Sequence, residues 1–287
     1  MSRLFERTAV SGSDRKRVFF RLDDVGRAKS PLRDVLSAFV TRHIPIHCSV
    51  IPGLLQNETA SYLLELLDLS SGIEIGQHGW MHANYYGKGE FGSNRSLELQ
   101  LTDIAKGMQV IKRTFGDRQV PVFTPPYGRW TRDTLRAISQ LGFSAISCVM
   151  NNPKERWLGP VASKLGIRRF GTAMSFPFLI FSHHPGPIPS FTNIVEISTS
   201  VDTLLSYNPV RFRSAKSVLS SIERSFRKTS IVGVLLHPQY FSDRQRIEYL
   251  NSMLDLVCSS QDFEVTSLFK IRAITAMEGS SLRKLLA

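Results

Sequence analysis

The sequence has little cysteine. Its 287 residues include three, Cys48, Cys148 and Cys258, which are widely separated and form no CxxC or other paired spacing. That distribution argues against a disulfide framework and against a zinc site built from thiolates. A reduced cytosol is the compartment that fits it best.

Long apolar runs are absent as well. No stretch approaches the roughly 18 apolar residues of a membrane-spanning helix, and residues 1–7 lack the apolar core of a signal peptide. We therefore expect a cytoplasmic protein without a transmembrane segment. Internal repeats and low-complexity tracts are also missing, which argues against a solenoid or a repeat array.

Acidic residues are in deficit: 24 Asp and Glu stand against 36 Lys and Arg, for a net charge of +12. This balance favours anionic partners, namely nucleic acid, an acidic membrane surface, or a phosphorylated or acidic glycan. The alternative is a cation-rich surface that is simply solvated. Nucleic-acid binding is not predicted, because the basic residues are dispersed and no recognition motif occurs. Peripheral contact with a membrane through charge is compatible with the sequence.

The hydrophobic content of 42% is ordinary for a soluble globular protein and is enough for a large core. Apolar strand patterns alternate with helical ones, which predicts a parallel sheet with helices outside. The expected strands cover residues 18–23, 44–51, 73–77, 119–123, 143–149, 193–198, 231–236 and 263–266. We expect a flexible basic arm over residues 1–16 and a single domain over 17–287, with an irregular insertion at about 151–190.

Polar residues gather where two of these strands end. Asp23 and Asp24 follow the apolar run of the first strand, and adjacent carboxylates are costly at the end of a buried strand. His78 and His82, four residues apart, follow the third strand. A divalent cation held by Asp24, His78 and His82 would stabilise this arrangement.

Two later strands end in further candidates. The turn Thr124-Pro125-Pro126-Tyr127-Gly128 follows the fourth strand, and His237 closes the strand at 231–236. Each feature alone has a simpler interpretation: paired aspartates as a helix cap, an HxxxH spacing as chance, the proline turn as structure, and His237 as a core residue. Their joint occurrence at separate strand ends favours an active site.

In order and spacing, these four motifs resemble the polysaccharide deacetylase family, the NodB-homology group of carbohydrate esterases. The resemblance spans about residues 18–270. It implies a distorted (β/α) barrel of about seven strands with one divalent metal, most commonly Zn²⁺, at its carboxyl-end rim. It further implies that Asp24, His78 and His82 are the metal ligands, Asp23 the general base and His237 the general acid. The backbone N–H of Tyr127 would bind the oxyanion.

Pro126, Trp80 and Arg129 are the predicted substrate-binding residues. Two departures from the family pattern leave alternatives open. Thr124 stands where the family's third motif has an arginine that holds the base, and Arg21 or Arg129 could replace it. The family's Asp-x-Trp motif, which orients the acid histidine, has no clean counterpart; the candidates to replace it are Asp202, Glu196 and Trp157.

The resulting hypothesis is a hydrolase that removes an N-acetyl or related acyl group from an amino sugar. A cytoplasmic location and a basic surface favour a nucleotide-linked or lipid-linked sugar in the synthesis of a surface polysaccharide or lipopolysaccharide. Two alternatives remain. One is hydrolysis of another small amide C–N bond. The other is a catalytically silent, glycan-binding homologue that retains the metal.

Overall fold

The structure is a computed structural model that describes residues 15–26, 31–92, 94–149, 186–188, 191–227 and 229–275. The predicted arm over residues 1–16 and the predicted insertion over about 151–190 fall almost wholly outside the described residues. Trp157 falls outside them too. Among the described helices, none combines the length and the apolar character needed to cross a membrane.

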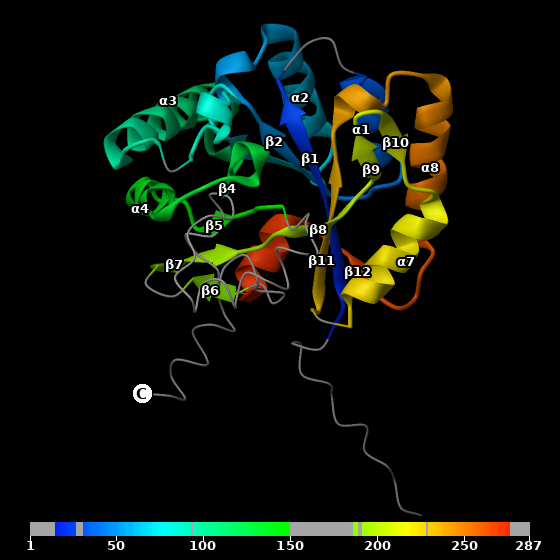
Figure 1. The fold of residues 1–287 in the computed structure, drawn as a ribbon. Helices are drawn as coiled ribbons and strands as arrows, with labels where there is room; N and C mark the ends of the chain where they lie inside the picture. The colour runs from blue at the N-terminus through cyan, green and yellow to red at the C-terminus, as the bar shows by residue number, and fades with distance from the viewer. Residues whose placement is uncertain are drawn as a thin grey trace, which may run out of the picture.

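One curved sheet organises the described chain (Figure 1). Its parallel strands, in order across the sheet, are β7 (Phe191–Glu196), β5 (Ala145–Ile146), β4 (Gln119–Thr124), β3 (Ile73–His78), β2 (Ile46–Val50), β1 (Arg17–Val25), β11 (Ile231–Leu236) and β8 (Thr199–Asp202). The short strand β6 (Gly186–Ile188) pairs antiparallel with β7, and β12 (Glu264–Val265) pairs with β1.

The two ends of this sheet meet. Strands β7 and β8 follow one another along the chain, and backbone N–H groups of Val195, Ile197 and Thr199 donate to successive carbonyls from Ser144 to Cys148. Strand β8 also pairs with β11 on its other side. The sheet therefore curls into a distorted (β/α) barrel, as the sequence predicts, and the carboxyl ends of its parallel strands share one rim.

Alternation along β1 separates the two faces of the sheet. Val18, Phe20 and Leu22 point outward into the main apolar cluster, whereas Phe19 belongs to a separate cluster inside the barrel. Arg21, two residues further along, is fully buried on that inner side. The strand thus packs against helices with one face and sends polar side chains into the barrel with the other.

The helices cover the outside of the sheet and return the chain between strands. They are α1 (Leu32–Val40), α2 (Asn57–Leu69), α3 (Leu97–Phe115), α4 (Arg132–Gln140), α7 (Ala215–Ser225) and α8 (Arg244–Cys258). Ser96, Thr131, Ser214 and Asp243 each accept a backbone N–H at the start of a helix and so stabilise that helix end. A helical segment over residues 268–275 buries Leu268 and Ile271 in the inner cluster with Phe19.

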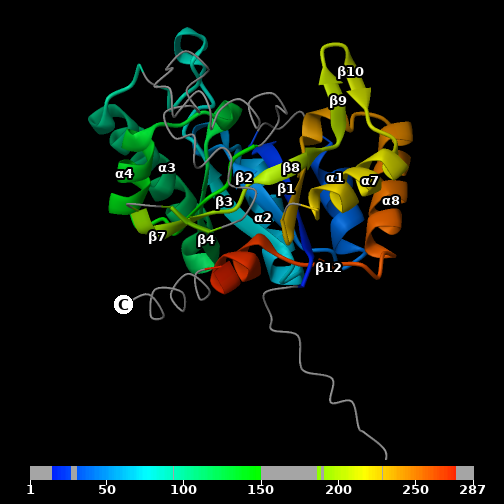
Figure 2. The same cartoon turned by 60° about the horizontal axis from the view of Figure 1, so that its bottom comes forward.

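The elements between residues 199 and 212 were not predicted from the sequence. Besides β8, this region holds a two-stranded hairpin of β9 (Leu204–Tyr207) and β10 (Val210–Phe212), which is separate from the main sheet. Figure 2 shows the hairpin and the loop between β3 and α3 rising from the same end of the molecule.

Candidate active site

Six predicted residues meet at the carboxyl-end rim of the barrel. Asp23, Asp24, His78, His82, Tyr127 and His237 come from the ends of β1, β3, β4 and β11, or from the loops that follow them, and all line one pocket of about 320 Å³. The other lining residues are Gly128, Val149, Tyr207, Leu235 and Tyr240. The parallel sheet therefore assembles groups that lie more than two hundred residues apart in sequence.

Backbone geometry brings both aspartates to this pocket. Alternation along β1 would send Asp23 and Asp24 to opposite faces of the strand. Asp24 instead adopts a φ of 60°, in the left-handed region that non-glycine residues seldom occupy. This turn places its carboxylate in the pocket beside that of Asp23. His82 has a φ of 54°, so two of the three candidate ligands depend on unusual backbone conformations.

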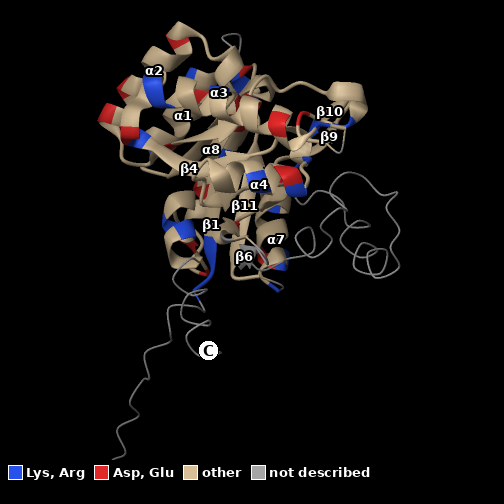
Figure 3. Ribbon diagram, turned by 90° about the vertical axis from the view of Figure 1, so that its left-hand side faces the viewer, with Lys and Arg blue, Asp and Glu red and all other residues tan. Residues whose placement is uncertain are grey.

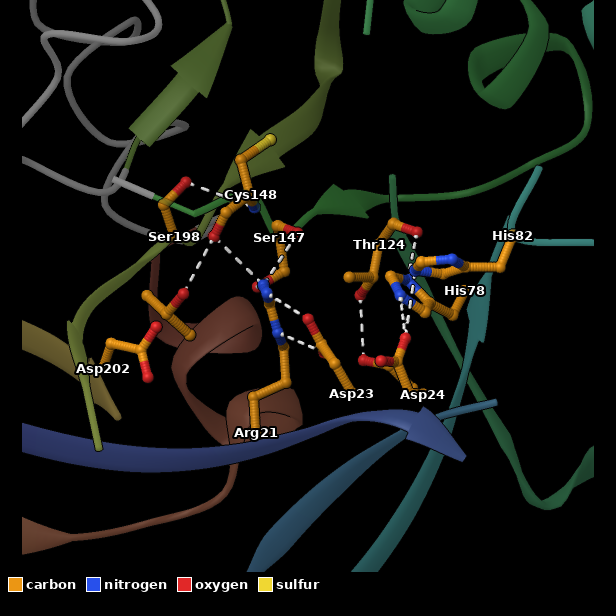
Figure 4. Close-up of polar contacts among 12 residues, drawn as sticks. Arg21, Asp23, Asp24, His78, His82, Thr124, Ser147, Cys148, Ser198 and Asp202 are labelled. Atoms are coloured by element: carbon orange, nitrogen blue, oxygen red, sulfur yellow. Dashed lines mark hydrogen bonds and ion pairs between the residues drawn. The ribbon is translucent and has the colours of Figure 1, made fainter. Parts of the chain in front are cut away.

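Asp24, His78 and His82 form a cluster that could hold a metal ion. One ligand atom from each lies within 4.8 Å of the others. Asp24 Oδ1 is 3.0 Å from Nε2 of His82 and 3.4 Å from Nε2 of His78 (Figure 4). A carboxylate and two imidazoles are a donor set that suits zinc and related divalent ions.

The hydrogen bonding of His78 supports this assignment. Its Nδ1 lies 2.9 Å from the carbonyl oxygen of Thr124, which can only accept, so Nδ1 carries a proton. In a neutral ring, Nε2 then directs a lone pair at the carboxylate of Asp24, and two acceptors face each other at 3.4 Å. Either a second proton or a cation must lie between them. A divalent cation fits, since backbone carbonyls commonly orient metal-binding histidines in this way.

Charge favours the ionised form of Asp24. Burial alone raises the pKa of its carboxyl, but the hydrogen bonds and charges of the adjacent imidazoles outweigh burial and hold this pKa far below its ordinary value. The pKa of His78 is raised: burial lowers it, while the charges of Asp23 and Asp24 raise it more. The cluster is therefore built around a negative charge that requires a positive partner.

Asp23 is held by Arg21. The guanidinium donates from Nε and Nη2 to the two carboxylate oxygens, both at 2.8 Å, and the pair is almost completely buried. Its Nη1 donates to the backbone oxygens of Ser147 and Cys148 and to the Ser147 hydroxyl, at 2.8 to 3.0 Å (Figure 4). Burial raises the pKa of Asp23, but the charge of Arg21, with smaller effects of His78 and His237, lowers it overall.

Of the two arginines that could hold Asp23, the structure thus has Arg21 in that position. Arg129 instead donates to the carbonyl oxygen of Gly87. A signal for this was present in the sequence: residues 21 and 23 lie two apart on one strand and therefore on the same face.

His237 lines the pocket and packs against two tyrosines. Its ring packs edge-on against Tyr207 at 5.6 Å and Tyr240 at 6.0 Å between centroids. Within the described residues, its buried Nδ1 has no hydrogen-bond partner. Asp202 is paired with Leu235 in the sheet and interacts electrostatically with His237.

Among the three candidates for the acid-orienting position, Asp202 is therefore the one placed beside His237. Tyr207 donates its hydroxyl to Asp202 at 2.5 Å, and burial raises the pKa of that carboxyl. Glu196 does not line the pocket; it accepts from the hydroxyl of Ser198. Sequence reasoning missed Tyr207, because the hairpin that carries it was not predicted.

Tyr127 lies at the rim with a φ of 60°. Its hydroxyl donates to the carbonyl oxygen of His82 at 3.2 Å, and its ring lies 4.5 Å from that of His82. The strained backbone of Tyr127 fixes the direction of its peptide groups next to the candidate metal ligands.

The three predicted substrate-binding residues do not line the pocket. Pro126 is the buried residue of the turn, the backbone N–H of Trp80 donates to Glu90, and Arg129 contacts the β3–α3 loop. Sequence reasoning missed Glu90, which is fully buried and also accepts the backbone N–H groups of Met81 and His82.

Glu90 thus fixes the loop that carries the second histidine. Gly79 makes this possible, since it has a φ of 59° and an added Cβ would lie 2.3 Å from the Glu90 carboxylate.

This combination of a parallel (β/α) barrel and a carboxylate–histidine cluster at its carboxyl-end rim is typical of a metal-assisted hydrolase. Residues 12–146 match the family model described as polysaccharide deacetylase. This match spans just under half of the chain and shows that residues 12–146 are similar to polysaccharide deacetylases, a similarity that supports a hydrolase of carbon–nitrogen bonds other than peptide bonds.

Solved structures share the fold at low sequence identity. A putative polysaccharide deacetylase from Mycobacterium smegmatis superposes with a TM-score of 0.66 at 14% identity, covering 94% of this chain and 93% of that one. A probable polysaccharide deacetylase from Pseudomonas aeruginosa PAO1 gives 0.64 at 11% identity and 91% of each chain. The Puue allantoinase gives 0.63 at 11% identity, covering 92% and 91%. No curated protein matches the sequence.

Proposed function

We propose that the chain is a metal-dependent hydrolase that removes an N-acetyl or related acyl group from an amino sugar. The observation that carries this proposal is the pairing, in one pocket, of a candidate metal triad with an arginine-held carboxylate, Asp23, and a histidine, His237. Asp24, His78 and His82 would hold the metal, most suitably Zn²⁺. When bound at such a site, zinc lowers the pKa of a water ligand to about 7 and polarises a carbonyl oxygen.

The protein's own groups supply the proton transfers. Arg21 keeps Asp23 ionised, so its carboxylate is ready to accept a proton from the attacking water. The backbone N–H of Tyr127 stabilises the oxyanion. His237 donates a proton to the departing amine. Tyr207 packs against the ring of His237 and is itself held by its hydrogen bond to Asp202.

The substrate we propose is a cytoplasmic acetamido sugar linked to a nucleotide or a lipid. A pocket of about 320 Å³ is at the small end of ligand sites and suits a single sugar ring. The net charge of +12 favours a substrate with a phosphate-containing carrier.

A second candidate is hydrolysis of another small amide C–N bond, and the restricted pocket is the observation that favours it. Acetate release from acetamido sugars distinguishes the two: turnover of other small amides without any acetate release would support the second. The retained Arg21–Asp23 pair counts against a silent binding protein, which would not need a buried, oriented carboxylate.

The experiment that tests the proposal is metal content by elemental mass spectrometry. Wild type should carry a near-stoichiometric divalent ion, and Asp24→Ala and His78→Ala should lose it. The control is His43→Asn, because His43 is exposed and lies outside the pocket. A wild-type protein that carries no metal and cannot be reconstituted with zinc would contradict the proposal.

A further inference from the structure

Exposed apolar side chains gather around the pocket mouth. The described residues include nine large hydrophobic side chains that are exposed, and six of them lie on loops at the carboxyl-end rim. Single exposed apolar residues are normal on a protein surface, but a group at one end of a molecule marks an interaction site. The six are Met81, Tyr86, Tyr127, Leu205, Tyr207 and Val210.

Half of this group lies on the β9–β10 hairpin. Leu205 is 62% exposed, and Tyr207 and Val210 are 42% and 37% exposed. The hairpin is a two-stranded sheet of its own that projects from the rim (Figure 2). An isolated hairpin gains little stability from an exposed leucine and valine, so these side chains are available for an external apolar phase.

The loops that surround the pocket mouth carry mostly cations, whereas the acidic Asp23 and Asp24 lie inside the pocket. Over the helices, Lys and Arg are interspersed with Asp and Glu (Figure 3). The rim segments 79–95, 125–131 and 204–213 instead contain the cations Lys88, Arg95, Arg129, Arg211 and Arg213 and a single acid, Glu90. Glu90 is fully buried, whereas Lys88 and Arg211 are exposed. Asp243, at the start of α8, is an acid in a neighbouring segment and pairs with Arg246.

We propose that this rim docks on an anionic lipid bilayer, with the tip of the β9–β10 hairpin entering the interface. Apolar side chains enter the acyl boundary, tyrosines suit the headgroup level, and cations meet anionic headgroups. The apolar residues project from separate loops on both sides of the pocket mouth, which suits a soft lipid surface better than a flat protein interface. The pocket then opens toward the bilayer, so that its substrate is a lipid-linked amino sugar; this last step rests on the proposed function.

Vesicle co-sedimentation tests the docking. Wild type should bind vesicles made of equal parts phosphatidylcholine and phosphatidylglycerol, and should bind pure phosphatidylcholine far more weakly. The double variant Leu205→Ser/Val210→Ser should bind the mixed vesicles at least about tenfold more weakly, since two apolar anchors are lost. Arg211→Gln should weaken binding several-fold at low salt and less at high salt.

Two controls match these variants at the opposite end of the sheet. Leu69→Ser removes a leucine that is 69% exposed, and Arg118→Gln removes an exposed arginine that pairs with Asp68. Both should bind the mixed vesicles as wild type does. The thermal unfolding midpoint and metal content of the hairpin variant should equal those of wild type, which shows that it is folded.

Three results would overturn the docking proposal. Wild type could remain in the supernatant with both vesicles, or the hairpin variant could bind as tightly as wild type. Alternatively, light scattering could show a wild-type dimer that the hairpin variant loses, which would make the rim an interface between two copies. Vesicle binding by a protein that holds no metal would leave the docking intact and contradict the proposed function instead.

Discussion

Replacement of Arg21 should separate catalytic positioning from charge. The guanidinium is fully buried and makes five hydrogen bonds, two of them to the carboxylate of Asp23. Arg21→Met removes the charge and leaves Asp23 ionised without its partner, in a position where breaking a buried ion pair costs about 3–5 kcal/mol. Because a domain is stable by only about 5–15 kcal/mol, this variant will be close to its folding limit.

Arg21→Lys is the sharper variant. Lysine keeps the positive charge but cannot form the two parallel bonds that fix the carboxylate, so we expect a smaller loss of stability and a loss of kcat of at least about tenfold. In the double variant Arg21→Met/Asp23→Asn no buried charge is left unpaired. Its loss in the free energy of unfolding should therefore be smaller, by about 1–3 kcal/mol, than the sum of the losses in Arg21→Met and Asp23→Asn.

Urea unfolding of wild type, Arg21→Met, Asp23→Asn and the double variant gives the coupling free energy between the two residues. The rate of acyl release by Arg21→Lys gives the effect on positioning. A coupling below about 0.5 kcal/mol would refute the reasoning, since residues that do not interact are additive within that range. Wild-type kcat in Arg21→Lys would show that the bidentate geometry does not orient the base.

Further predictions concern three other groups. Burial raises the pKa of Glu196 from 4.5 to about 8. The folded protein therefore favours the protonated carboxyl: its full stability is present below pH 4.5, and part of it is lost as pH rises to about 8. The stability advantage of Glu196→Gln in urea titrations should therefore grow by up to about 1.4 kcal/mol per pH unit across that window and be absent at pH 4. Gly79→Ala, which places a Cβ against Glu90, should weaken zinc affinity about 10- to 100-fold in chelator competition, whereas Gly87→Ala, with open space around it, should not. Tyr207→Phe leaves half-buried Asp202 without its hydroxyl donor and should lower the free energy of unfolding by about 1 kcal/mol; an unchanged value would show that water replaces the hydroxyl.

The strands that the sequence predicts well are those with long apolar patterns. The strand predicted at residues 231–236 has the same bounds as β11, and the predictions for β3 and β4 differ by one residue at one end. The elements at 199–212 were missed because β8 and the hairpin strands are three or four residues long, too short to show a period. The partner of β8 is β11, which lies elsewhere in the chain, so tertiary contacts decide that strand; β9 and β10 pair only with each other.

The same limit applies to the candidate site. Strand ends predict that Asp23, His78 and His237 share a rim, because parallel strands place their carboxyl ends together. The left-handed φ of Asp24 could not be predicted, since nothing in the residue type requires it. Likewise, the contact between Tyr207 and His237 depends on a hairpin that only the folded chain reveals.

Thr124 stands where the third motif of polysaccharide deacetylases has an arginine, and this difference has a structural consequence. Because Arg21 belongs to the same strand as Asp23, the orientation of the candidate base is set within β1 and does not depend on the turn after β4. Thr124 has other contacts instead: its carbonyl oxygen accepts from His78, and its hydroxyl meets that of Ser49 at 3.1 Å. The turn that carries Tyr127 can therefore change shape without moving the base. Under the proposed function, holding Asp23 from β1 would separate proton transfer from the loop that carries Tyr127, so that loop could differ between substrates while Asp23 stays in place.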